Sequence, residues 1–233
     1  MKNHKYYKIS ATLFIFATIL NCSASNAVNF NRLSSISLAK KIKQDPAAKN
    51  LEFKVLNLAL QSYTKVQNNH RLKHKLNNNY LTIVDYSLPS TERRLWVIDL
   101  INNKVLINTL VAHGKNSGNN VARKFSDIPE SRMSSIGVFV TGEQYIGKHG
   151  LSMRLHGLEK HFNGNAYSRA IVMHSASYVN ERMANKHGRI GRSFGCLAVN
   201  QQVIKDLINT VKNGTLIFSY YPEPTWLQNS SFL

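Results

Sequence analysis

The chain has 233 residues, of which 43% are hydrophobic, enough for one large domain with a buried core. Lysine and arginine number 30 against 12 acidic residues, so the formal net charge is +18 and an acidic partner or surroundings is expected. The sequence has no zinc-finger spacing, no basic helix leading into heptads and no aromatic-rich RNA-binding motif, which argues against the common nucleic-acid-binding classes. Because the charge is spread along the whole chain, a solvated basic surface is the favoured interpretation.

The first 27 residues have the layout of a secretory signal peptide. The lysine-containing start MKNHKYYKIS precedes the apolar run ATLFIFATIL and the small-residue site Ser25–Ala27. This run is short for a transmembrane span, so we expect cleavage, a mature chain that begins near Val28, and no stable membrane anchor. An uncleaved anchor is the alternative. Since cleavage would also remove Cys22, we expect one thiol, Cys196, in a protein secreted across the inner membrane to the periplasm or cell envelope.

Residues 28–79 are expected to form a helical N-terminal extension. Leu56 and Leu60 belong to an apolar stripe with the three- and four-residue spacing of one helix face. His70 and His74 lie one helical turn apart, but no carboxylate or third ligand accompanies them. A solvated face is therefore favoured over a metal site.

Residues 80–221 carry strand patterns and are expected to form the body of the protein. The runs YLTIVDYS, RLWVIDL and RAIVMHSA are rich in β-branched and aromatic residues, and Asn102–Asn103 marks a hairpin turn. A clear helix, NQQVIKDLINTVKNG, is expected to be capped at Asn200 and to precede the closing strand TLIFSYYP. Residues 222–233 are expected to be a C-terminal tail. The sequence thus predicts an α+β, β-rich domain with a helical prefix.

Cys196 lies in GRIGRSFGCLAVN, a loop of glycines, small residues and arginines. One leftover cysteine in an exported protein indicates a reactive thiol or an intermolecular pair, although a buried inert cysteine is the alternative. A cysteine nucleophile needs a base that takes its proton. His174 is the best placed histidine, because it ends the apolar strand AIVM and small residues follow it. His156 is the second candidate, since Gly157 leaves it accessible.

Metal catalysis is weakly supported by the histidine spacing. His156 and His161 lie five residues apart with Glu159 between them, which is not the HExxH arrangement of zinc peptidases. The sequence also lacks GxSxG and a phosphate-binding glycine loop followed by lysine. We expect neither a metal ion nor a cofactor.

Three motifs together resemble the murein L,D-transpeptidase catalytic domain. They are SSIGVFVTG, MHSASYV and GRIGRSFGCLAVN, and the resemblance covers about residues 80–220. The last motif is most similar to the branch in which Gly-Cys is followed by an apolar residue, Ala and Val. The resemblance implies a β-rich catalytic domain and an exported enzyme that acts on peptidoglycan stem tetrapeptides through a cysteine thioester. It leaves open an L,D-carboxypeptidase activity beside transpeptidation.

The resemblance also implies roles for individual residues. Cys196 matches the nucleophile, His174 the general base, and Ser175 the residue whose backbone carbonyl orients the imidazole. Ser193 and Gly195 match the small residues of the cysteine loop. The amides of Gly195 and Cys196 are expected near the oxyanion, where donors aimed in advance lower the barrier most.

Two positions depart from the family pattern. Phe194 stands where a histidine is common, and Ala198 stands where arginine or asparagine is common. We expect Arg192 or Arg154 to supply the missing polar group and to bind stem carboxylates, and we place His156 with them on the substrate side.

Two alternatives of other classes stay open, a catalytically silent peptidoglycan-binding module and a secreted nucleic-acid-binding protein. The first is favoured if the departures at Phe194 and Ala198 abolish activity. If the enzyme is active, we expect the Cys196 thiol to be more acidic than a free cysteine, because Arg192, His174 and a helix start are nearby. We also expect water as well as an amine to resolve the thioester.

Overall fold

The structure is a computed structural model, and it describes residues 35–72, 76–77 and 79–233. The predicted signal peptide, its cleavage site and His74 lie outside the described residues. The helices are α1 (Ser35–Ile42), the short 3-10 helix η2 (Pro46–Ala48), α2 (Phe53–Gln67), α3 (Glu181–His187), α4 (Ile204–Val211) and α5 (Pro224–Asn229). The strands are β1 (Tyr80–Asp85), β2 (Leu95–Asp99), β3 (Lys104–Thr109), β4 (Gly137–Gly147), β5 (Gly150–Gly157), β6 (Val172–Ser175), β7 (Leu197–Val199) and β8 (Leu216–Tyr220).

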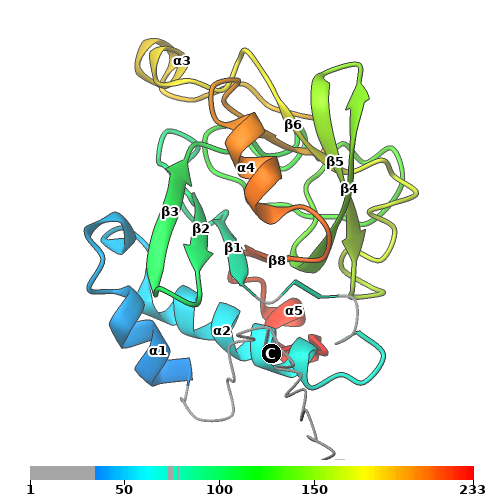
Figure 1. Ribbon diagram of the computed structural model, residues 1–233. Helices are drawn as coiled ribbons and strands as arrows, with labels where there is room; N and C mark the ends of the chain where they lie inside the picture. The colour runs from blue at the N-terminus through cyan, green and yellow to red at the C-terminus, as the bar shows by residue number, and fades with distance from the viewer. Residues whose placement is uncertain (1–34, 73–75, 78) are drawn as a thin grey trace, which may run out of the picture.

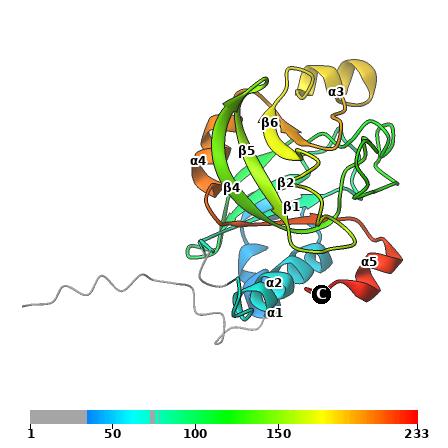
Figure 2. The same ribbon diagram turned by 90° about the vertical axis from the view of Figure 1, so that its right-hand side faces the viewer.

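The eight strands form one sheet in the order β3-β2-β1-β8-β4-β5-β6-β7. The pairs β1–β8 and β6–β7 are parallel, and the other neighbours are antiparallel. Figure 1 shows α4 in front of the sheet, with α1, α2 and α5 gathered at its lower end. The turned view in Figure 2 separates α4 from these three helices. The predicted α+β, β-rich fold class is confirmed.

Both faces of the central strands are buried, and each face belongs to a different hydrophobic core. Ile83 and Phe218 pack with α1, α2 and α5, whereas Val97 and Ile217 pack with α4. This division follows from the two-residue alternation of side chains along a strand. Strands buried on both faces read as continuous apolar runs, which is the pattern of YLTIVDYS and RLWVIDL.

The N-terminal helices are part of this packing. Leu56 and Leu60, which belong to the predicted stripe, are fully buried within the same core as Ile83 and Phe218. The helical segment therefore buries its apolar face directly on the sheet.

The C-terminal residues, predicted to be a tail, contain a packed helix. Glu223 caps α5, because its side chain accepts a hydrogen bond from the Trp226 amide at 2.6 Å. The Trp226 ring is fully buried against Phe218, and its indole N–H donates to Glu159 at 3.2 Å. These contacts join positions that are distant in sequence, which local patterns do not reveal.

The helix expected to be capped at Asn200 begins later. Asn200 accepts a hydrogen bond from the Gln202 amide and starts a turn, and α4 itself begins at Ile204. The helix buries Ile204, Leu207, Ile208 and Val211, as its apolar stripe predicts. In the described part of the chain, no helix combines the length and hydropathy needed to cross a membrane.

Candidate active site

The parallel pairing of β6 with β7 places the segments of His174 and Cys196 side by side. In this register Met173 lies opposite Leu197, and His174 lies opposite Ala198. Paired residues of a parallel sheet point to the same side, and alternate residues of a strand share a face. Cys196 lies in the bend that leads directly into β7, so the pairing brings the cysteine loop next to the strand of His174. Ala198 is fully buried and ends at Cβ, which leaves room beside the imidazole.

The His174 ring is oriented by its neighbour's backbone. Nδ1 lies 2.8 Å from the Ser175 carbonyl oxygen, as the resemblance implied. Because a carbonyl only accepts, Nδ1 carries the proton and Nε2 keeps its lone pair. Burial lowers the pKa of His174, the Ser175 carbonyl opposes this, and the nearby His149 lowers it further. The imidazole is therefore neutral near pH 7 and able to accept a proton.

His149 is a neighbour of the base that the sequence did not suggest. It lies in the turn between β4 and β5, and its ring stacks on His174 with centroids 4.3 Å apart and planes 20° apart. Its carbonyl also accepts a hydrogen bond from Ser175 Oγ at 3.2 Å. His149 thus touches the imidazole directly and steadies the residue that orients it.

The Cys196 thiol faces the backbone of the segment before β6. Its Sγ lies 3.6 Å from the Ala170 carbonyl oxygen. Burial raises the pKa of Cys196, against the opposing effects of the Val172 amide, the Arg169 charge and its own amide. The expectation of an unusually acidic thiol is therefore wrong for the free protein. The resting pair is a neutral thiol and a neutral imidazole, so the proton must move when the sulfur attacks.

Ser193 and Gly195 fix the shape of the cysteine loop. Ser193 Oγ donates to the Cys196 carbonyl at 2.7 Å and accepts the Gly195 amide at 3.1 Å. Gly195 has a φ of +119°, and a Cβ there would lie 2.7 Å from the Met133 carbonyl oxygen, so only glycine fits. Since the Gly195 N–H is donated within the loop, the structure does not support its predicted oxyanion role, and the Cys196 amide is the remaining candidate.

Arg192, expected on the substrate side, supports the loop instead. Its Nη1 donates to the carbonyl oxygens of Lys115 and Gly118 at 3.2 and 2.9 Å. These bonds hold the segment after β3 against the cysteine loop. The Arg192 guanidinium therefore has backbone partners in the protein.

Arg154 and His156 do lie on the face of His174. In β5 the residue opposite His174 is Ser152, and Arg154 and His156 follow it at alternate positions. Two tyrosines cover these side chains. His156 stacks on the Tyr167 ring at 4.9 Å, and the Arg154 guanidinium lies over the Tyr145 ring at 4.6 Å. Together they form a basic and aromatic wall beside the base.

The sequence of the chain matches the L,D-transpeptidase catalytic domain family over residues 47–220. The protein belongs to this family. No curated protein matches the chain. Similar solved structures include L,D-transpeptidases from Mycobacterium smegmatis (14% identity, TM-score 0.39) and Stackebrandtia nassauensis (13%, 0.38). The alignments cover 61% and 82% of this chain, and 59% and 79% of those chains, so this chain aligns with less than two thirds of the first.

The sequence patterns did not identify two buried arginines of this L,D-transpeptidase domain. The first of them is Arg94. It is fully buried and donates from Nε and Nη2 to the Val111 carbonyl, and from Nη1 to that of Leu88. Nη2 also lies 2.8 Å from His113 Nδ1. Burial and the Arg94 charge lower the pKa of His113 to about 4, so this histidine stays neutral. The His113 carbonyl accepts a hydrogen bond from the Ser193 amide at 3.0 Å, so His113 links the cysteine loop to Arg94.

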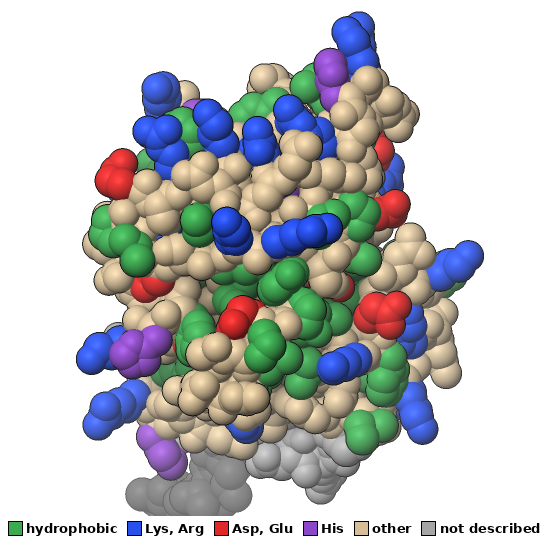
Figure 3. All heavy atoms as spheres, turned by 180° about the vertical axis from the view of Figure 1, so that it is seen from behind, with side chains coloured by type: hydrophobic (Ala, Val, Ile, Leu, Met, Phe, Trp, Pro, Cys, Tyr) green, Lys and Arg blue, Asp and Glu red, His purple; other side chains and the backbone are tan. Residues whose placement is uncertain are grey.

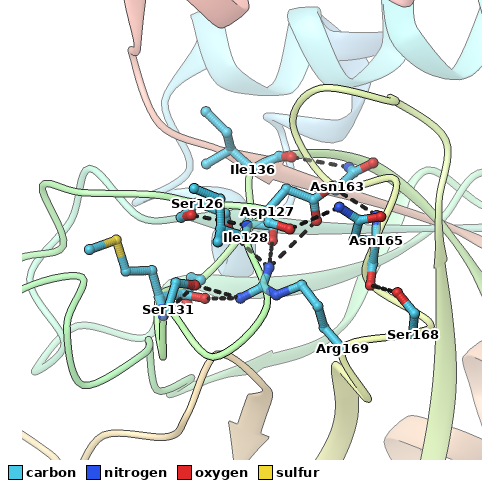
Figure 4. A network of polar contacts seen from close by, with 12 residues as sticks. Ser126, Asp127, Ile128, Ser131, Ile136, Asn163, Asn165, Ser168 and Arg169 are labelled. Carbon is cyan, nitrogen blue, oxygen red and sulfur yellow. Dashed lines mark hydrogen bonds and ion pairs between the residues drawn. The ribbon is translucent and has the colours of Figure 1, made fainter.

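The second is Arg169, whose side chain is 3% exposed and pairs with Asp127 at 3.5 Å. Figure 4 shows its guanidinium at the centre of a polar network. The partners of the network are the Ser126 and Met133 carbonyls and the Ser131 and Ser135 hydroxyls, at 2.6–3.1 Å. Arg169 thereby holds residues 126–135 against the cysteine loop, and its charge acts on Cys196. Among the described residues, no group of three His, Cys, Asp or Glu side chains could hold a metal ion.

Proposed function

We propose that the protein is an exported peptidoglycan L,D-transpeptidase that acts on stem tetrapeptides through a thioester at Cys196. The observation that supports this proposal is the β6–β7 pairing, because it joins the strand of His174, whose imidazole bonds to the Ser175 carbonyl, to the strand that directly follows Cys196. Membership of the L,D-transpeptidase family supports the reaction class. Export rests on the layout of the first 27 residues.

In the acylation step, Cys196 Sγ attacks the carbonyl carbon that links the third and fourth stem residues. His174 Nε2 accepts the thiol proton as the carbon–sulfur bond forms. The Cys196 amide donates to the oxygen that becomes negative. The carbon–nitrogen bond then breaks, and His174 returns the proton to the departing amine of the terminal D-amino acid. The products are a thioester and a free amino acid.

In the second step, an amine of another stem or a water molecule attacks the thioester carbon. His174 takes a proton from the attacking group, and the sulfur leaves and recovers a proton. An amine gives a cross-linked dimer, and water gives a tripeptide. Phe194 is 64% exposed beside the thiol and Ala198 is buried beside His174, so neither supplies a polar group that would hold an amine acceptor. We therefore assign both outcomes to this enzyme.

The basic surface suits a polymer that carries carboxylates. Figure 3 shows Lys and Arg side chains gathered along the upper part of one face, with few acidic side chains among them. A positive surface attracts an anionic substrate and raises its local concentration. The same charge would also draw nucleic acid, with a strong dependence on salt.

Incubation with a defined tetrapeptide muropeptide, followed by mass analysis, tests the proposal. We expect tripeptide without acceptor, cross-linked dimer at rising acceptor concentration, and an acylated Cys196 peptide. Cys196→Ala is expected to lose all three, and His174→Gln is expected to lose turnover.

Three other results would contradict parts of the proposal. Dimer alone, with no tripeptide in the absence of acceptor, excludes the mixed reaction. Products that persist in Cys196→Ala exclude this nucleophile. Stem-peptide binding without any turnover favours the silent binding module.

A further inference from the structure

A cavity of about 700 Å³ lies between the N-terminal helical segment and the β2–β3 hairpin. The described residues that line it are two lysines, three residues with side-chain amides, one aspartate and one proline. Its volume falls within the range of about 300–1,000 Å³ that is typical of small-molecule sites. The cavity beside the cysteine loop is a different one: it measures about 410 Å³, has Arg132, Arg169 and Ala170 in its lining, and belongs to the candidate active site.

The larger cavity is remote from the nucleophile. Lys104, in its lining, begins β3, and the chain that follows β3 reaches β7 at Val111, which pairs with Val199. From Lys104 to Val111 an extended chain spans about 23 Å, at about 3.3 Å per residue. Figures 1 and 2 show α1, which contributes Lys41 to the lining, at the opposite end of the molecule from α3. A small ligand in this cavity would therefore not touch Cys196.

The two lysines of the lining have no protein partner within the described part of the chain. Lys41 and Lys104 are exposed, and neither ammonium donates a hydrogen bond or joins an ion pair there. Lys43 shows the alternative, because its ammonium donates to three backbone carbonyl oxygens of the segment that follows α1, at 2.7–2.9 Å. An ammonium carries three donors, so the protein uses Lys43 fully, whereas Lys41 and Lys104 remain available to an anion.

The aspartate of the lining is already bonded to backbone amides. Asp45 Oδ1 accepts the Ala47 amide at 2.9 Å, and Oδ2 accepts the Val105 amide at 2.8 Å. Asp45 thus joins the helical segment to the hairpin and forms no ion pair with either lysine. The second bond also occupies the outward amide at the start of β3, so an extended peptide cannot pair with it as a further strand.

The other polar groups of the lining suit hydroxyls. Gln44, Asn102 and Asn103 carry amides, and an amide both donates and accepts hydrogen bonds, as a hydroxyl does. Pro46 is the apolar member of the described lining, which holds no aromatic ring on which a nucleic-acid base would stack. Small-molecule sites are mostly apolar, so this composition favours an anion rich in hydroxyls over an apolar ligand.

We propose that this cavity binds an acidic saccharide, at a site separate from the reaction at Cys196. Lys41 and Lys104 bind the anionic group, and the amides of Gln44 and Asn103 bind hydroxyls. Because the two lysines come from opposite walls of the cavity, the ligand also links the helical segment to the sheet. Two sources would supply this chemistry: a peptidoglycan glycan strand whose muramic acid carboxylates are free, and a phosphorylated polysaccharide.

The test compares three amino-sugar disaccharides that differ in their anionic group. The first is neutral di-N-acetylglucosamine, the second pairs N-acetylglucosamine with N-acetylmuramic acid and has a free carboxylate, and the third is phosphorylated diglucosamine. Calorimetry with the wild-type protein measures Kd for each. We expect at least one acidic disaccharide to bind about 3- to 10-fold more tightly than the neutral one, as exposed charge-assisted hydrogen bonds allow. The tighter of the two acidic probes identifies the source.

Variants of the two lysines locate the binding. Lys41→Gln and Lys104→Gln should each weaken binding of the acidic disaccharide about 3- to 10-fold. Lys40→Gln is the matched control, because Lys40 is an exposed neighbour on α1 that does not line the cavity. Cys196→Ala should bind as the wild type does. Acetylation of the wild-type protein, followed by mass analysis, needs no substitution, and the saccharide should protect Lys41 and Lys104 but not Lys40.

Four results would overturn the inference. Equal affinity for the neutral and acidic disaccharides, or equal losses in Lys40→Gln and Lys41→Gln, excludes a role of these lysines in binding an anion. Tetraglutamate that binds as tightly as the saccharides excludes the ligand class. Binding that falls in Cys196→Ala without protection of the cavity lysines assigns the saccharide to the active site. Binding of none of the disaccharides removes the site and leaves the transpeptidase proposal standing, because stem-peptide turnover is measured separately.

Discussion

Arg169 and Arg132 line the same cavity, yet their guanidinium groups have different surroundings. Arg169 is buried, pairs with Asp127, and donates to carbonyls and hydroxyls of one loop. Arg132 is exposed, lies on the Phe194 ring, and keeps its N–H edge open. The difference shows that burial decides the task of an arginine. A desolvated guanidinium must be fully bonded and so builds the site, whereas an exposed one remains available to a ligand.

The largest expected effect is on the buried member of this pair. Arg169→Met leaves the Asp127 carboxylate buried without its partner, so the free energy of unfolding should fall by about 3–5 kcal/mol. Arg132→Met should change it by less than about 0.5 kcal/mol, as most surface substitutions do. Chemical denaturation measures both values. Adding Asp127→Asn to Arg169→Met should recover part of the lost unfolding free energy. Equal effects of Arg169→Met and Arg132→Met would refute the contrast between the two arginines.

A second contrast concerns two glycines with positive φ. Gly195 has the Met133 carbonyl 2.7 Å from the position of a Cβ, whereas Gly188 has open space around it. Gly188→Ala should cost about 1–2 kcal/mol through its left-handed backbone alone. Gly195→Ala should cost about 1–3 kcal/mol more, because the loop must also shift, and turnover should fall with it. Chemical denaturation measures the stability of both variants, and tripeptide release measures turnover. A similar loss of stability in Gly188→Ala and Gly195→Ala would argue against the close contact with the Met133 carbonyl.

The pH dependence of kcat/KM tests the surroundings of His174, the proposed base. His174 must be neutral to accept the thiol proton, and burial lowers its pKa below the ordinary 6.5, so the acid limb of kcat/KM should lie below pH 6.5. His149→Phe keeps a stacked ring but removes a group that lowers this pKa, so the limb should move to higher pH. His149→Gln should also lose the stacking and lower kcat. The control His161→Phe should leave the acid limb where it is. An acid limb that also stays in place in His149→Phe would contradict an electrostatic effect of His149 on His174.

At Arg154 we expect a small effect on stability and a larger one on substrate affinity. This arginine has a side chain 33% exposed and lies over Tyr145, so Arg154→Gln should reduce the unfolding free energy by less than about 1 kcal/mol. If it binds a stem carboxylate, KM should rise while kcat changes little, and Arg154→Lys should restore part of the affinity. Steady-state kinetics measure this. A fall in kcat with unchanged KM would exclude a binding role.

The parts of the site that the sequence revealed are those encoded locally. A β-branched run ending at His174 and a glycine-rich loop around Cys196 are visible within a few residues, and parallel pairing then joins them. Arg169 was not visible, because its partner Ser126 lies 43 residues away and no periodic pattern marks either. His149 meets His174 only through the register of β5 with β6.

The same distinction explains the elements that were misjudged. The stripe of α2 repeats every three or four residues, so the sequence predicted the face that the helix buries. Trp226 packs against Phe218 and donates to Glu159, 67 residues earlier, so no local pattern marked the C-terminal residues as a packed helix. The acidic thiol was inferred from neighbours in sequence, whereas desolvation by the surrounding fold sets the direction of its pKa.

The nucleophile stands next to β7, a three-residue strand at the end of the sheet. Short edge strands open locally at a lower free energy than the centre of a sheet, so their amide hydrogens exchange sooner. β7 has backbone bonds to β6 on one side and isolated contacts with residues 111–112 on the other. An acyl group on the sulfur that also fills the adjacent cavity would link this edge to the segment before β6. Covalent inhibitors should therefore slow hydrogen exchange at Leu197–Val199 far more than at β1, which offers a readout of site occupancy that needs no turnover.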